Sequence, residues 1–515
     1  MRLLKLSLAL TLSAACAAYP HPHGQYPFAA VHSTNYQGNE NHGEYARFDN
    51  EQVLRVQVSS MAELKLLEAV VEEKNLDLWS NLRIGTVDVR VPASELEDFK
   101  ATVPLPSSVM IPNLQDLVPE QAPATLQDNL KKWNFMDDSF WNDYHDLATL
   151  NNFTETMVAQ FPELVTRTSL GHTHEGREVF GLTIHGHDKE DKAQNDDEDH
   201  DNDDDGDESD DELDLEDLIE DLVKEVRAKA RSWWSWLAGS SPKVKTHKKS
   251  SKLKKHPKAI VFHGGQHARE WISSATVTYI AKELILGYGV NEKITKLVDQ
   301  FEFTIIPVLN ADGYAYTWER NRMWRKNRQP TSIPFCPGID PNRNWGYKWN
   351  HGGSSGNPCS EAYHGPRPFA ANEPKMVADY INKKGNVVGY IDFHAYSQLW
   401  MTPFGGDCRE TPKDDEDIME GGLVAAKALK DVHGTKFSVG SVCNIIYQAS
   451  GGSLDWTYAE GGVKYSYAVE LRDTGRHGFM LPKEEILPSG QETFAAFLNL
   501  TNFIRKREKQ WGHMV

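Results

Sequence analysis

Two short apolar runs, each leading directly into potential metal ligands, constrain the fold of this chain most strongly. Residues 259–262 come just before His267 and Glu270, and residues 387–393 end at His394. A continuous apolar run of this length, bounded by loop residues, is typical of a buried strand in a parallel sheet. The carboxyl ends of neighbouring strands meet at one edge, where binding sites form. The sequence therefore predicts that these three side chains lie together.

The residue types fit a catalytic zinc site. Such a site has three protein ligands, typically imidazole and carboxylate, and leaves a fourth position for water. The water also needs a general base, and Glu470, which follows the strand-like residues 465–469, is a suitable carboxylate. His-x-x-Glu alone is a weak signal, because a single pair is more often a surface or packed histidine. The residues around the pair, and further motifs elsewhere in the chain, therefore have to decide whether it marks a zinc site.

Six motifs resemble those of the zinc carboxypeptidases of the pancreatic A/B type, and they occur in that family's order. They are residues 267–272, 321–326, 340–345, 394–398, 450–456 and 470–475. The resemblance covers nearly everything from about residue 50 to the end, apart from one insertion. The layout is similar to a fungal secreted branch of the family, some members of which are considered inactive.

The resemblance implies one Zn²⁺ per chain, bound by His267, Glu270 and His394. It also implies that Glu470 acts as the base and later as the proton donor. Arg325 matches an arginine whose charge stabilises the oxyanion that forms on the scissile carbonyl. Catalysis is therefore assigned to Glu470 and Arg325.

The same resemblance implies five substrate-binding residues. Asn342 and Arg343 supply an amide and a planar guanidinium suited to a free C-terminal carboxylate. Tyr447 matches a mobile tyrosine that closes over the substrate, and Arg269 lines the outer subsites. Leu454 takes the pocket-floor position, which is acidic in enzymes that remove Lys or Arg, so we expect a preference for aromatic and large aliphatic termini. Any one of these residues alone is more often an ordinary surface or core residue; their joint occurrence favours the functional interpretation.

The fold expected for the catalytic part is α/β, with a mixed, mostly parallel eight-stranded sheet flanked by helices. Residues 51–118 alternate strand and helix patterns and predict a small α+β domain, which resembles the family's ferredoxin-like activation domain. The predicted catalytic domain comprises residues 139–187 and 258–510. The connector 119–138, with Lys131-Lys132, is the expected cleavage site for an activating endoprotease. The alternative is a permanently attached folding aid.

The first 18 residues have the basic start, short apolar stretch and small residues of a signal peptide. Residues 19–50 are expected to be a low-order segment. A secreted protein is therefore predicted, with the vacuole as another possible destination. Two Asn-x-Thr sequons, at Asn152 and Asn499, are candidate glycosylation sites.

Four cysteines remain after removal of the signal peptide, which suits an oxidising compartment. The family pairs the positions of Cys336 and Cys359, which leaves Cys408 and Cys443 as the inferred second pair, although four cysteines allow three pairings.

An insertion at residues 188–257 departs from the family pattern. Between Asp188 and Asp221 it holds 21 acidic residues and two lysines, a net charge of −19 that equals that of the whole chain. A segment with so many like charges cannot form a buried core, so we expect a disordered, solvated loop. A Trp-rich amphipathic helix and a Lys-rich linker follow. The insertion is either a simple spacer or a docking element for a wall, membrane surface or partner.

Two functions from different classes remain open. The first is a secreted zymogen of a zinc metallocarboxypeptidase, acting on peptide or protein C-termini. The second is an inactive zinc protein that binds peptide termini, with a cell-wall or vacuolar role. In inactive members of the branch the base and the Asn-Arg pair are replaced, whereas Glu470, Asn342 and Arg343 are retained here. A third hypothesis, a signalling or structural protein organised by the acidic insertion, is weaker. It would require the catalytic residues to occur together by chance. We expect a monomer with no nucleic-acid partner and no transmembrane segment.

Overall fold

The computed structural model describes residues 45–80, 82–118, 138–186 and 257–510, all within one compact unit, Glu40–Val515. The predicted signal peptide, including its expected cleavage point, lies outside the described residues. So do nearly all of the segments 19–50, 119–138 and 188–257, with Lys131-Lys132 and the Trp-rich helix. No helix in the described ranges is both long enough and apolar enough to cross a membrane.

The N-terminal part of the described chain is a four-stranded antiparallel sheet with two helices. Its elements are β1 (Gln52–Val58), α1 (Met61–Lys74), β2 (Asp77–Leu78), β3 (Gly85–Val91), α2 (Leu96–Thr102) and β4 (Ser107–Ile111). The strand order β2-β3-β1-β4 and the βαββαβ sequence confirm the ferredoxin-like prediction. Ser60 caps α1 by accepting the N–H of Glu63, and Asn75 ends the helix in the left-handed conformation. Strand β2 was not predicted, because its two residues are too short for a hydrophobic pattern.

The larger part is an eight-stranded mixed sheet with helices packed on it. Its strands are β5 (Val165–His172), β6 (Glu178–Ile184), β7 (Lys258–His263), β8 (Phe301–Ile306), β9 (Val387–Ala395), β10 (Leu399–Thr402), β11 (Ser438–Ser441) and β12 (Tyr465–Leu471). Its α-helices are α4 (Leu147–Gln160), α7 (Trp271–Gly287), α8 (Glu292–Gln300), α9 (Ala311–Glu319), α10 (Asn372–Lys384), α11 (Asp415–His433), α12 (Val442–Ile445), α13 (Ser453–Ala459) and α14 (Ile486–Gln510).

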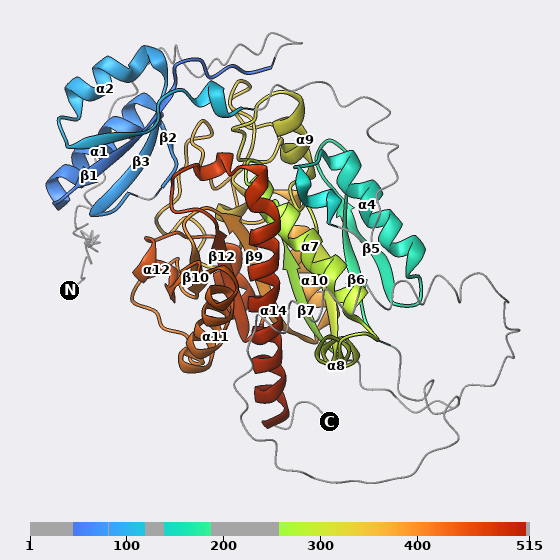
Figure 1. Ribbon diagram of the computed structural model, residues 1–515. Coiled ribbons are helices and arrows are strands. Elements are labelled where there is room, and N and C mark those ends of the chain that lie inside the picture. Colours follow the sequence, from blue (N-terminus) through green and yellow to red (C-terminus); the bar gives the residue numbers. More distant parts are fainter. Residues whose placement is uncertain (1–44, 81, 119–137, 187–256, 511–515) are drawn as a thin grey trace, which may run out of the picture. The chain divides into compact units, whose positions relative to one another are not determined.

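The strand order is β11-β10-β12-β9-β7-β8-β6-β5. The central strands β12, β9, β7 and β8 run parallel, as does the outer pair β10 and β11, while the remaining neighbours are antiparallel. The predicted mixed, mostly parallel sheet is therefore confirmed. Figure 1 shows α14, in red, running beside α7 and α11 along the sheet. Because β7 and β9 are covered on both faces, their apolar runs are continuous rather than alternating.

Candidate metal and peptide-terminus site

The three predicted metal ligands come together at the carboxyl ends of β7 and β9. These strands are parallel neighbours, with His263 opposite Asp392. Glu270 Oε1 is 2.9 Å from His267 Nδ1, and Glu270 Oε2 is 2.9 Å from His394 Nδ1. All three residues are buried, and their potential ligand atoms lie within 4.8 Å of one another.

The surroundings of the two histidines fit a metal ion bound through Nδ1. The other ring nitrogen of His267 lies 3.1 Å from Asp340 Oδ1, and that of His394 lies 2.9 Å from Asp392 Oδ2. A carboxylate that accepts the Nε2 proton fixes the tautomer and leaves the Nδ1 lone pair for a metal. Two imidazoles and one carboxylate are a donor set that suits zinc.

The charge of Glu270 also suits metal binding. Burial by itself would raise the pKa of Glu270, but His267 and His394 outweigh that effect and hold the pKa below its ordinary value. The carboxyl group is therefore ionised at neutral pH, as a metal ligand must be.

Glu470 lies beside this group on β12, paired in register with His394 of β9. Its Oε2 atom is buried and finds no hydrogen-bond partner among the described residues. Burial is the main cause that raises the pKa of Glu470 to about 8, with Glu270 and Asp392 adding to it and His394 and Arg325 opposing it. A carboxyl group with a raised pKa and an uncommitted oxygen is suited to accepting and returning a proton.

Arg325 approaches the triad from the segment after α9. Its guanidinium donates to Asp340 Oδ2 at 2.9 Å, and its Nη1 atom lies 3.7 Å from Glu270 Oε1. Asp340 thus contacts both the candidate metal ligand His267 and the Arg325 cation. Asp340 was not predicted from the sequence as a site residue, although it lies inside one of the family motifs.

Asn342 and Arg343 occupy the short 3₁₀ turn Pro341–Arg343. Asn342 Nδ2 lies 3.2 Å from His394 Nε2, and the Arg343 guanidinium donates to the Tyr447 hydroxyl at 2.5 Å. The amide, the guanidinium and Tyr447 are therefore grouped next to the triad.

Leu454 lies in the first turn of α13, is buried, and packs with Met401 and Ala468. Val442 of α12 borders this apolar cluster. The neighbouring buried acid, Asp455, is a residue that the sequence analysis missed.

The Asp455 carboxylate accepts the backbone N–H groups of Gly405 and Gly406, at distances from 2.6 to 3.0 Å. Burial raises the pKa of Asp455 to about 6, although these two N–H groups lower it. The acid beside the apolar cluster is therefore already engaged by the backbone.

The antiparallel domain contacts residues of the site directly. Arg269, which is predicted to line the outer subsites, donates from Nη1 to Asp77 Oδ2 at 2.7 Å, and both side chains are buried. Tyr396 donates its hydroxyl to Asp88 at 3.1 Å. Trp79, whose indole N–H reaches Asp77, meets Phe479 edge to face.

Both predicted disulfides are present, Cys336–Cys359 and Cys408–Cys443, with Cα–Cα distances of 4.8 and 5.3 Å. The second bond joins the segment after Gly405 to α12, next to the Leu454 cluster.

The sequons remain predictions. Asn152 and Asn499 lie in α4 and α14, and the threonines of both sequons, Thr154 and Thr501, are buried.

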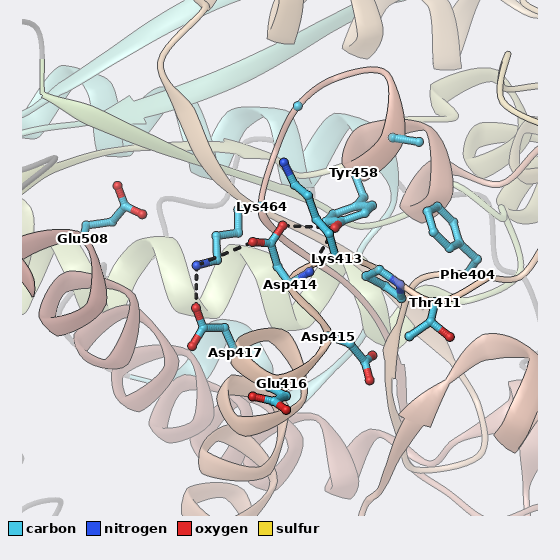
Figure 2. A pocket seen from close by; sticks show the side chains of 13 residues that line it. Phe404, Thr411, Lys413, Asp414, Asp415, Glu416, Asp417, Tyr458, Lys464 and Glu508 are labelled. Atoms are coloured by element: carbon cyan, nitrogen blue, oxygen red, sulfur yellow. Dashed lines mark hydrogen bonds and ion pairs between the residues drawn. The ribbon is translucent and has the colours of Figure 1, made fainter. Parts of the chain in front are cut away.

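A hollow lies at the start of α11 and is lined by several acidic side chains (Figure 2). None of His267, Glu270 and His394 is among its lining residues. Two of its acids are already paired: Asp417 lies 2.5 Å from Lys464 Nζ, and Asp414 accepts the Tyr458 hydroxyl at 3.0 Å. We assign it no role.

Comparison with known proteins agrees with this geometry. The family described as zinc carboxypeptidase matches residues 150–496, and the carboxypeptidase activation peptide matches residues 54–121. The chain belongs to the zinc carboxypeptidase family. Its relatives within the family include both carboxypeptidases and proteins named as inactive.

Carboxypeptidase A2 of Mus musculus is 33% identical over 467 residues, covering 89% of this chain and 94% of the relative. The inactive metallocarboxypeptidase ECM14 of Ajellomyces dermatitidis is 32% identical over 496 residues, covering 89% of this chain and 73% of the relative. The crystal structure of thrombin activatable fibrinolysis inhibitor superimposes with a TM-score of 0.69 at 27% identity, covering 89% of this chain and all of that one. Relatives named carboxypeptidase and relatives named inactive therefore resemble this carboxypeptidase homologue to a similar degree.

Proposed function

We propose that this protein is the secreted zymogen of a zinc metallocarboxypeptidase that removes aromatic or large aliphatic residues from peptide C-termini. The observation that carries the proposal is the convergence of His267, Glu270 and His394 beside Glu470, whose Oε2 atom is uncommitted. Zinc supplies Lewis-acid chemistry when bound by this triad.

The residues around the triad suit each step of peptide hydrolysis. Asn342 and Arg343 bind the terminal carboxylate and thereby place the last peptide bond next to Glu470. Glu470 takes a proton from water as the oxygen of that water adds to the carbonyl carbon. Arg325 stabilises the negative charge that develops on the carbonyl oxygen. When the C–N bond breaks, Glu470 returns the proton to the departing amine nitrogen.

The substrate preference follows from the Leu454 cluster. Leu454, Met401 and Ala468 offer an apolar surface, and a Phe or Leu side chain gains free energy when it is buried there. A Lys or Arg side chain would lose hydration without a free acidic partner, because Asp455 is occupied by backbone N–H groups.

The contacts from Asp77 and Asp88 support the zymogen assignment. They engage Arg269 and Tyr396 and so occupy the outer part of the site while leaving the triad itself untouched. Cleavage in the connector 119–138 would allow this domain to leave.

An inactive peptide-binding protein is the second candidate, favoured by the similarity to inactive relatives. One experiment distinguishes the two candidate functions. The purified proprotein is cut with trypsin, and release of Phe from a blocked dipeptide is measured with and without a zinc chelator. The proposal expects release that the chelator abolishes and added zinc restores. A folded, zinc-loaded, fully cut protein that binds the dipeptide without releasing Phe would support the second candidate instead.

A further inference from the structure

Asp392, which accepts the Nε2 proton of His394, is also the centre of a buried polar cluster that reaches Asn342. It lies on β9 two residues before His394, so both side chains point to the same face of the sheet. Asp392 Oδ2 lies 2.9 Å from His394 Nε2, 2.6 Å from Gln266 Nε2 and 2.5 Å from Ser453 Oγ. The side chain is fully buried, so these donors compensate the carboxylate for its lost hydration.

Ser453 connects this cluster to the amide of Asn342. Ser453 is the first residue of α13, and its backbone N–H, which has no acceptor within the helix, donates to Asn342 Oδ1 at 2.9 Å. This bond fixes the orientation of the amide, so the Nδ2 group faces His394 Nε2 at 3.2 Å. His394, Asp392, Ser453 and Asn342 therefore form a closed ring of polar contacts.

These contacts determine which nitrogen of His394 carries its proton and where the Asn342 N–H groups can donate. A metal ion on His394 Nδ1 requires the ring proton on Nε2, and that single N–H donates to Asp392. Asn342 Nδ2 is itself a donor and cannot accept it. The Asn342 N–H groups are consequently left for an acceptor such as a terminal carboxylate.

We infer that Asp392 is a positioning residue that holds the metal ligand His394 directly and, through Ser453, the terminus-binding amide of Asn342. Three of the four contacts in the ring are hydrogen bonds, and the contact between Asn342 and His394 is not. The inference rests on the proposed zinc peptidase function and adds a link between metal affinity and recognition of the peptide terminus. Loss of the Asp392 charge weakens the metal site, and loss of the Ser453 hydroxyl disturbs terminus binding alone.

The first test measures zinc affinity of the uncut, full-length protein by competition with a chromophoric chelator, which requires no catalysis. Asp392→Asn keeps the shape but removes the charge, and we expect zinc to bind about tenfold or more weakly. The matched control is Asp312→Asn, because Asp312 is equally buried but contacts Thr173 and Arg177 instead of a metal ligand. The control should bind zinc like the wild type; wild-type affinity in Asp392→Asn would overturn the inference.

The second test uses Ser453→Ala in the cut enzyme. This change breaks the bond to Asp392 but keeps the backbone N–H that binds Asn342. We expect unchanged zinc affinity, a KM for a dipeptide ending in Phe raised about threefold to tenfold, and nearly unchanged kcat. An unchanged KM would overturn the inference, even if Asp392→Asn fails to fold. A wild-type protein that binds no zinc would instead count against the proposed function.

Discussion

The Arg269 guanidinium donates a 2.7 Å hydrogen bond to the Asp77 carboxylate, although 192 residues separate the two in the chain. Asp77 belongs to the antiparallel domain that matches the activation peptide, and Arg269 lies between the candidate metal ligands His267 and Glu270. The bond therefore ties the activation domain to the wall of the candidate active site.

Asp77→Asn should loosen this hold, because the substitution leaves the buried Arg269 charge without its anionic partner. We expect the uncut protein to release C-terminal Phe roughly tenfold faster than the uncut wild type, while the cut enzymes remain equal. The assay is Phe release before and after trypsin.

Asp98→Asn is the control for Asp77→Asn. Asp98 belongs to the same domain, but its side chain is 62% exposed and pairs with Lys74, away from the site. Equal activity of the uncut Asp77→Asn and wild-type proteins would show that this contact does not restrain the zymogen.

Leu454→Asp should reverse the side-chain preference. A carboxylate in the apolar cluster with Met401 and Ala468 would attract a Lys or Arg terminus and repel an aromatic one. We expect kcat/KM for a Phe terminus to fall by about 10- to 100-fold and that for a Lys terminus to rise. Leu454→Met, which conserves the volume, is the control and should retain the Phe preference. A Lys preference already present in the wild type would show that Leu454 is not the pocket floor.

The raised pKa of Glu470 predicts a pH dependence of stability in zinc-free protein. Its folded-state pKa of about 8 lies above the ordinary value of 4.5, so the protonated form favours the folded state. The stabilisation is fully present below about pH 4.5 and is lost as the pH rises through about 8.

Glu470→Gln removes this titration. Denaturant unfolding of the chelated proteins at pH 5 and pH 8.5 should therefore show a smaller loss of stability in the variant than in the wild type. Parallel losses in the two proteins would mean that the pKa of Glu470 is not raised.

The disulfide Cys408–Cys443 closes a segment of 35 residues and borders the Leu454 cluster. Replacing both cysteines by serine should lower the free energy of unfolding by about 3 to 4 kcal/mol. It should also raise KM for a Phe terminus, because Val442 lies next to Cys443. The double variant at Cys336 and Cys359 is the comparison; it should lose similar stability with a smaller effect on KM. An equal change in KM in both variants would contradict the assigned location of the pocket.

The eight-stranded sheet and both disulfides could be predicted from the resemblance to a known family, whereas the candidate ligands also leave a local signal. His267 and His394 follow apolar runs, and these runs become neighbouring parallel strands. Asp392 also lies in such a run, but its partners Gln266 and Ser453 come from distant segments that only the fold brings together. Asp77 likewise belongs to no motif. Its role depends on a contact with Arg269, which lies in the other domain, so the sequence alone could not reveal it.

The most direct test of the central claim compares wild-type protein with Glu470→Gln after both have been fully cut in the connector and loaded with zinc. The variant should bind zinc about as tightly as the wild type, because Glu470 is not one of the three candidate ligands. Its release of C-terminal Phe should nevertheless fall by about a thousandfold or more, because no base remains to move the proton. Release at the wild-type rate by the variant, or no release by the zinc-loaded wild type, would contradict the assignment of this protein as a zinc carboxypeptidase with Glu470 as its base.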